Sequence, residues 1–219
     1  MEEEIFKRCE IIEDKLIEYG FKKINNSYHY KESILNNNFR VEIIYKNNKI
    51  IGKIIDNELN EELLNYRVDN ITGEFINNIK STYINILKDI KKKCTLSKNY
   101  VSNQANRISL IIKELYGDDP EFLWKDDENS VFRNSINKKW YGIIMYINKE
   151  KLGGENKKVE VMNVKLPPEM IEELLKRKDF YKAYHMNKKY WITFILNDSL
   201  PDEKIIELVK ISHTYTEKK

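Results

Sequence analysis

The stretch "KYWITFILNDSLPDEKIIELVKIS", residues 189–212, places a strand pattern directly before a helix pattern. Strand parity assigns two sets of side chains to opposite faces: Ile192, Phe194 and Leu196 to the core face, and Lys189, Trp191 and Thr193 to the outer face. Ser199 and Asp202 stand three apart, as in a capping box at a helix start. The buried side of that helix is expected to hold Ile205, Ile206, Val209 and His213. A strand followed by an amphipathic helix is typical of α+β folds.

The residues before this stretch continue the same alternation of strands and helices. Period-two patterns predict strands at 130–136, 139–147 and 158–166. Pro168 suits the first turn of a helix within residues 166–178. An earlier helix is indicated by an apolar stripe at helical spacing: Val101, Ala105, Ile108, Ile112 and Leu115. Together these elements predict one domain over residues 99–219.

Residues 1–98 carry similar elements in the same general order: a helix, then strands, then a helix. A first helix, ending at Gly20, is predicted from a stripe of Ile5, Phe6, Cys9, Ile12, Leu16 and Ile17. Strands are expected at 27–35, 39–46 and 49–56, with turn-forming asparagines between them. A long helix beginning near Thr72 carries Phe75, Ile76, Ile79, Tyr83, Leu87 and Ile90. We therefore predict an α+β protein of two small domains, 1–98 and 99–219, each a mainly antiparallel sheet packed against helices.

The composition indicates a folded protein with a small excess of positive charge. Of its 219 residues, 41% are hydrophobic and 33% are charged, and the formal net charge is +3. No apolar run reaches the roughly 18 residues of a membrane span, and residues 1–10 lack the pattern of a signal peptide. We expect a cytoplasmic protein with no membrane partner, in which Cys9 and Cys94 are buried thiols. Because the net charge is small, any basic surface must be confined to one part of the protein.

The sequence lacks the patterns that mark catalytic, phosphate-binding or metal sites. His29, His185 and His213 lie on separate predicted elements, without Cys/His metal spacing. The glycine-rich phosphate loops and the GxSxG nucleophile motif are absent. An acid–base site at His185 stays open, because histidine titrates near neutral pH, but a surface or interface role is favoured. We expect no enzymatic activity, no metal and no cofactor.

Two short segments share one pattern, "NKKWY" at 137–141 and "NKKYW" at 187–191. Lysines flanked by aromatic rings can contact phosphate while the rings stack on a base or sugar. Alternatively, Asn-Lys-Lys forms a solvated turn with the aromatic pair packed beneath it. The residues alone leave both interpretations open.

Residues 104–214 resemble the MmcQ/YjbR family of small bacterial proteins. The resemblance rests on "YGDDPEFLW", "VFRNSINKKWYGII", "VEVMNVKLPPEMIEELL" and "YKAYHMNKKYWITFILNDSLPDEKIIELVKIS", with "HMNKKYWITF" the most specific part. It implies a CyaY-like (frataxin-like) domain that binds DNA, preceded by an N-terminal extension. The matching positions are Arg133, Lys138, Lys139, Trp140, His185, Asn187, Lys188, Lys189 and Trp191. Frataxin-type iron binding is not implied, because the helix at 102–117 has only Glu114 as an acidic residue.

The residues and the resemblance together predict a non-enzymatic protein that binds DNA weakly and largely without sequence preference. Its partner would be double-stranded DNA, and its surface the basic-aromatic turns with the adjoining strand face. The alternative is a protein–protein adaptor that uses the Trp, Tyr and Met side chains of residues 183–191 as interface anchors.

Overall fold

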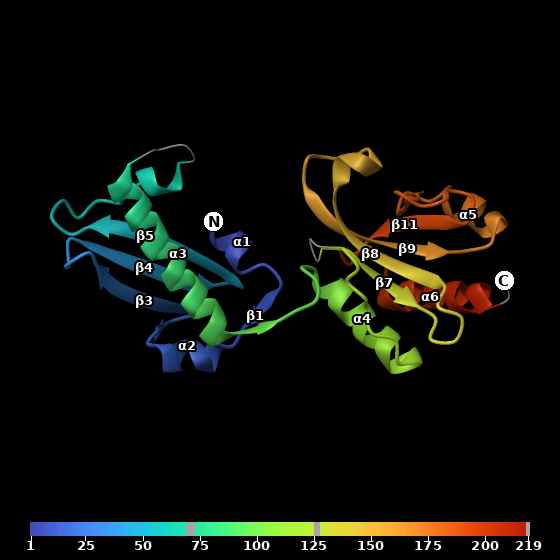
Figure 1. Cartoon of the computed structure of the whole chain (residues 1–219), viewed down its shortest axis with the longest axis horizontal. Coiled ribbons are helices and arrows are strands. Elements are labelled where there is room, and N and C mark those ends of the chain that lie inside the picture. The colour runs from blue at the N-terminus through green and yellow to red at the C-terminus, as the bar shows by residue number, and fades with distance from the viewer. Residues whose placement is uncertain (69–72, 125–127, 218–219) are drawn as a thin grey trace. The chain divides into compact units, whose positions relative to one another are not determined.

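The computed structural model describes residues 1–68, 73–124 and 128–217 (Figure 1). The chain divides into two compact units, Met1–Lys98 and Asn99–Lys219. Each unit has an antiparallel sheet and an apolar core of its own. The predicted α+β class is confirmed.

The first unit contains a four-stranded sheet of order β2-β3-β4-β5. Its strands are β2 (Lys22–Ile24), β3 (Ser27–Ile34), β4 (Phe39–Lys46) and β5 (Lys49–Asp56). The three longer strands form the predicted meander, and Asn37 and Asn47 adopt left-handed conformations in the connections. A 3-10 turn, η1 (Asn65–Arg67), comes before α3 (Glu74–Cys94). Residue Thr72, the predicted helix start, lies outside the described residues.

Helix α3 packs along one face of this sheet (Figure 1). Tyr83 and Leu87 of the helix and Val41, Ile43 and Ile54 of the sheet are fully buried. Alternation along β4 buries every second side chain from Phe39 to Tyr45, because that side faces the helix.

The N-terminal segment does not form the single helix that its apolar stripe predicted. It forms α1 (Glu2–Ile5), β1 (Cys9–Ile11) and α2 (Glu13–Tyr19) instead. Arg8 adopts a φ of 55°, which interrupts the helix, and β1 pairs antiparallel with β6 (Thr95–Ser97). Pairing with a segment far away in the sequence therefore outweighs the local helical pattern. Cys94 is a buried free thiol, as predicted, whereas Cys9 is only half-buried.

The second unit contains a five-stranded antiparallel sheet of order β10-β11-β9-β8-β7. Its strands are β7 (Ser130–Arg133), β8 (Trp140–Asn148), β9 (Lys158–Lys165), β10 (Phe180–Lys182) and β11 (Trp191–Ile195). Its helices are α4 (Asn103–Tyr116), α5 (Pro168–Leu174) and α6 (Asp202–Glu217), with a 3-10 turn, η2 (Lys149–Leu152), after β8. Ser102 caps α4 by accepting a hydrogen bond from the N–H of Ala105. Two members of the apolar stripe are exposed: Val101, which lies before this helix, and Leu115, which lies in its last turn.

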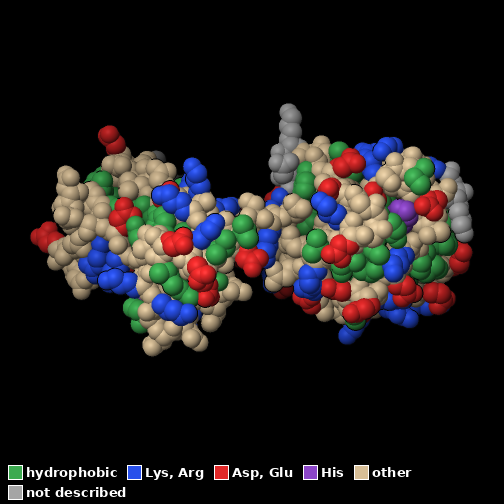
Figure 2. Space-filling model, turned by 90° about the horizontal axis from the view of Figure 1, so that it is seen from below, with side chains coloured by type: hydrophobic (Ala, Val, Ile, Leu, Met, Phe, Trp, Pro, Cys, Tyr) green, Lys and Arg blue, Asp and Glu red, His purple; other side chains and the backbone are tan. Residues whose placement is uncertain are grey.

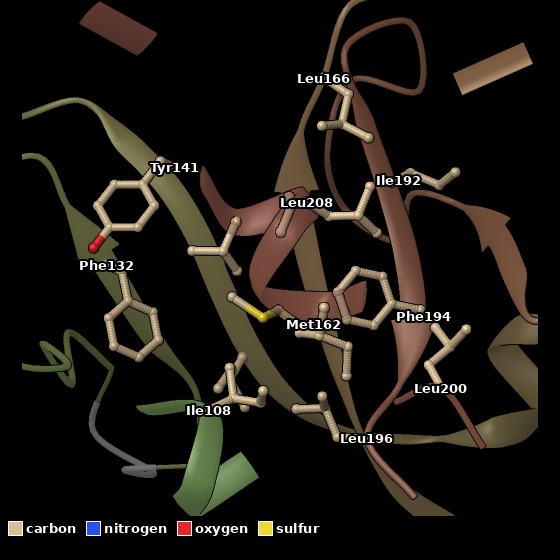
Figure 3. Close-up of a cluster of buried hydrophobic side chains, with 14 of the residues drawn as sticks. Ile108, Phe132, Tyr141, Met162, Leu166, Ile192, Phe194, Leu196, Leu200 and Leu208 are labelled. Carbon is tan, nitrogen blue, oxygen red and sulfur yellow. The ribbon is translucent and has the colours of Figure 1, made fainter. Parts of the chain in front are cut away.

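The main core of the second unit lies between the sheet and helices α4 and α6 (Figure 3). Phe132, Met162 and Phe194 come from three strands and pack toward Ile108 of α4 and Leu208 of α6. All five side chains are fully buried. The core face predicted for the 189–196 strand is thereby confirmed.

The opposite face of this sheet carries a second apolar cluster. It is made of Val131, Ile143, Met145, Ile147, Val161, Ala183, Trp191 and Ile195. Within the described part of the chain, no residue of an α-helix belongs to it. Aromatic side chains of the β10–β11 connection, including Tyr184 and Tyr190, pack against it instead. Both faces of the sheet are therefore apolar.

Candidate nucleic-acid interface

The two Asn-Lys-Lys turns lie at the same end of the five-stranded sheet. One turn joins β7 to β8, and the other precedes β11. Gly142 pairs with Val164, and Trp191 pairs with Lys165, so β8 and β11 both begin beside the end of β9. Since neighbouring strands lie about 4.8 Å apart, these two strand starts are separated by about 10 Å. Two segments that are distant in the sequence thus lie close together at one end of the strands.

Both turns close with the same kind of side-chain hydrogen bond. Oδ1 of Asn137 accepts from the N–H of Lys139 at 2.9 Å, and Oδ1 of Asn187 accepts from the N–H of Lys189 at 3.0 Å. Such a bond from asparagine to the backbone two residues on defines an Asx turn. Asn137 also donates from Nδ2 to the carbonyl oxygen of Thr216 in α6, at 3.0 Å. The turn interpretation of both segments is therefore correct, and each asparagine has a structural role.

Lysines surround this end of the sheet, and we call them the basic edge: Lys138, Lys139, Lys165, Lys188 and Lys189. Lys138, Lys188 and Lys189 are exposed, and the other two are half-buried. None of them forms an ion pair with another residue in the ranges 1–68, 73–124 and 128–217. Their charges are therefore available to an external anion.

Lys165 was missed in the sequence analysis. Its signal was the alternation in "VEVMNVK", which places Lys165 on the same face of β9 as Val161 and Asn163. The strand order places Lys165 between the two turns, because β9 lies between β8 and β11.

A buried asparagine attaches the β7–β8 turn to α6. Asn134 is fully buried, and its Oδ1 accepts from the N–H of Ile136 at 2.9 Å. Its Nδ2 lies 3.2 Å from Nε2 of His213. Because Oδ1 already accepts from the backbone, the amide NH2 group faces the imidazole, and Nε2 is the acceptor. Nδ1 of His213 then carries the proton and faces Glu217 at 3.4 Å.

Two tyrosines hold His213 in place. Tyr116 stacks on the imidazole with ring centroids 3.9 Å apart, and Tyr141 meets it edge-on at 4.9 Å. Burial raises the pKa of both tyrosines, and the hydrogen bond from Tyr141 to Asp118 raises the pKa of Tyr141 further. His213 lies on the inner side of α6, as predicted, where it supports the turn.

Arg133 and Trp140 stabilise the same turn. Nε of Arg133 lies 2.9 Å from a carboxylate oxygen of Glu121, and Nη1 donates to the carbonyl oxygen of Lys138 at 3.3 Å. The guanidinium group also lies 5.5 Å from the ring centroid of Trp140, which in turn meets Trp124 edge-on at 6.2 Å. Arg133 is thus already paired within the unit, and Trp140 is half-buried.

The sequence predicts Trp191 on an exposed strand face, but in the structure this side chain is covered. It belongs to the second apolar cluster and is 6% exposed. The covering segment is the β10–β11 connection, which two hydrogen bonds attach to the sheet. Nδ2 of Asn163 donates to the carbonyl oxygen of Tyr184 at 3.0 Å, and the N–H of Tyr184 donates to Oγ1 of Thr193 at 3.2 Å. Parity placed Trp191 on the correct side of β11 but did not show that this side is covered.

His185 lies in the same connection and is exposed. Its φ of 57° is left-handed, and its ring contacts the ring of Tyr184 at 4.0 Å. No acidic side chain in the described ranges forms a hydrogen bond or ion pair with His185. Among the described residues, the ring of Tyr184 is therefore the contact that the structure gives for this imidazole.

On the face drawn in Figure 2, basic and acidic side chains are interspersed, in keeping with the net charge of +3. No group of three or more His, Cys, Asp or Glu side chains among the described residues could hold a metal ion. None of the described helices is long and apolar enough to cross a membrane.

Comparison with known proteins places the second unit among relatives. A sequence profile of the YjbR family matches residues 113–215. YyaQ, an uncharacterized protein of Bacillus subtilis, is 36% identical over 107 residues, which cover 48% of this chain and 91% of YyaQ. The chain belongs to the YjbR family. The predicted membership is confirmed, and the match to the YjbR profile contains both Asx turns.

A solved structure extends the YjbR comparison to the fold. The crystal structure of a protein from Pseudomonas syringae shares 36% sequence identity with this chain, with a TM-score of 0.50. The alignment covers 52% of this chain and 99% of that protein. Proteins of this kind therefore correspond to about half of the present YjbR-family chain.

Proposed function

We propose that this protein binds double-stranded DNA through the basic edge, weakly and largely without sequence preference, and that it catalyses no reaction. The observation that carries the proposal is the basic edge itself. Lysines from three separate segments meet at one end of the sheet, and none has an ion-pair partner in the described part of the chain. Unpaired cations at a rigid edge are complementary to the phosphate backbone.

The chemistry of the edge favours contacts to phosphates over contacts to bases. Lysine binds phosphate as a point charge, whereas base recognition usually needs bidentate groups such as arginine, asparagine or glutamine. Arg133 is engaged by Glu121, and Asn187 accepts a hydrogen bond within its own turn. Binding should therefore depend on ionic strength much more than on sequence.

The free thiols of Cys9 and Cys94 fit the reducing cytoplasm, which we propose as the location.

The adaptor alternative would use aromatic and Met side chains of residues 183–191. Its expected anchor Trp191 is buried, and Met186 and Tyr190 are partly buried against the sheet. The apolar area offered to a protein partner is therefore smaller than the sequence pattern implied. We keep duplex DNA as the proposed partner.

Fluorescence anisotropy with a short labelled duplex tests the proposal over a range of salt concentrations. If all five lysines contact phosphates, the logarithm of the association constant should fall with the logarithm of salt concentration with a slope of about −4 to −5. The double variant Lys188→Ala/Lys189→Ala should bind more weakly and reduce the magnitude of that slope by about 2.

The matched control is Lys151→Ala/Lys157→Ala, which removes the same charge from the β8–β9 connection at the other end of the sheet. It should leave the affinity nearly unchanged. Absence of binding at low salt, or equal losses in the two double variants, would refute the basic edge as a DNA-binding surface.

A further inference from the structure

An isoleucine stands at the tip of the β7–β8 turn, next to two lysines of the basic edge. Ile136 is 83% exposed, more than any other large hydrophobic side chain in the described part of the chain. Single exposed apolar side chains are common on protein surfaces, so exposure alone has no functional meaning. The backbone and the charges around Ile136 distinguish it.

The backbone that carries Ile136 is held on both sides. Its own N–H donates to Oδ1 of Asn134 at 2.9 Å, and the N–H of Lys138 donates to the carbonyl oxygen of Asn134 at 2.9 Å. The N–H of Asn134 donates to the carbonyl oxygen of Lys139 at 3.0 Å, which closes the turn. Asn134 is itself buried against α6. The turn presents Ile136 in a preformed position, so docking would order little additional chain.

Two lysines follow Ile136 in the same turn, so the apolar tip has positive charge beside it. Lys138 is exposed in a left-handed conformation, with φ 60°, and Lys139 follows it. A complementary surface must offer an apolar contact to Ile136 and anionic groups to the lysines beside it. The DNA minor groove has this character, because stacked bases lie between two rows of phosphates. Proteins that bend DNA insert side chains such as isoleucine between base steps from this groove.

We propose that Ile136 is an apolar wedge that enters the minor groove, partly unstacks one base step and bends the duplex. This inference rests on the DNA binding proposed above. It adds a preference for certain base steps in the duplex, which phosphate contacts alone do not create. Pyrimidine–purine steps such as TA unstack easily, so duplexes with a central TA step should bind more tightly than duplexes without one.

The test compares wild type, Ile136→Ala and the control Leu110→Ala on one duplex with a central TA step. Leu110 is 58% exposed on α4 and lies outside the turn, so its truncation removes a similar apolar surface. Anisotropy gives the affinity, and energy transfer between dyes at the two duplex ends gives the bend. Ile136→Ala should bind about tenfold more weakly. It should also lose the bend and keep the salt slope, since no cation is removed. Leu110→Ala should match wild type.

The outcomes separate this inference from the proposed function. If Ile136→Ala binds and bends the duplex like wild type, the wedge is refuted while DNA binding stands. If wild type binds no duplex at low salt, both proposals fail. Vesicles of anionic phospholipid provide a further arm: if Ile136→Ala weakens vesicle binding but leaves duplex binding unchanged, the tip contacts lipid and the DNA wedge is refuted. Unchanged melting temperatures would show that the variants remain folded.

Discussion

The side-chain amide of Asn134 lies 3.2 Å from Nε2 of His213, and this contact joins the β7–β8 turn to α6. Asn134 is fully buried, so its amide has no access to water and depends on these partners. The shape of an exposed, lysine-bearing turn is therefore determined by a buried polar contact beneath it.

Replacement of Asn134 by alanine should loosen this turn and destabilise the second unit. The change removes the amide of a fully buried residue and leaves the N–H of Ile136 and Nε2 of His213, both in partly buried contacts, without their partner. We expect a loss of about 1–3 kcal/mol in the free energy of unfolding, measured by urea denaturation. Amide hydrogen exchange at Ile136 and Lys138 should accelerate as well.

Ser135→Ala is the control for this prediction, because Ser135 is an exposed neighbour in the same turn. It should change the stability by less than about 0.5 kcal/mol. Equal stability of Asn134→Ala and wild type would show that the turn does not depend on its contact with α6.

The second prediction concerns the segment that covers Trp191. Thr193→Val keeps the volume of the side chain but removes Oγ1, which accepts from the N–H of Tyr184 and donates to Asn163. Since Thr193 and Asn163 are both fully buried, we expect a loss of about 1–3 kcal/mol. Trp191 fluorescence should shift to longer wavelength as the cover loosens. Thr214→Val, at an exposed position on α6, should reproduce neither effect.

The third prediction concerns the pH dependence of the first unit. Nζ of Lys31 lies 2.8 Å from Glu42, and Arg40 and Lys53 lie at 3.0 and 3.2 Å. The hydrogen bond from Lys31, followed by those from Arg40 and Lys53, lowers the pKa of Glu42 from 4.5 to about 2, although burial opposes the shift. The folded-state pKa is depressed, so the stabilisation is present above about pH 4.5 and is lost as the pH falls toward 2.

Glu42→Gln should therefore be less stable than wild type at pH 7, by about 1–2 kcal/mol after allowance for the partly exposed cations. The difference in the free energy of unfolding between wild type and Glu42→Gln should narrow as the pH falls from 4.5 toward 2, because Glu42 of wild type becomes protonated over this range. Urea unfolding at several pH values measures it. Glu61→Gln, at an exposed position, is the control. A gap that stays constant down to pH 2 would contradict this account of Glu42.

Local patterns predicted most of the fold because each depends on residues close together in the chain. The alternation of Phe39, Val41, Ile43 and Tyr45 predicted β4, since one face of that strand is buried. The stripe from Ile79 to Ile90 predicted α3 for the same reason. The stripe from Ile5 to Ile17 failed, because β1 gains its backbone hydrogen bonds from β6, near the other end of the unit.

For the candidate site, the sequence by itself determined the two Asx turns, because Asn-Lys-Lys closes its own hydrogen bond over three residues. It also determined which side of β11 each side chain occupies. Only the tertiary structure decided that both turns meet beside Lys165, that Trp191 is covered and that Arg133 is paired with Glu121. Those properties depend on strand order and on contacts between distant segments. A local sequence pattern reports the neighbours of a residue along the chain, whereas burial and free charge depend on its neighbours in space.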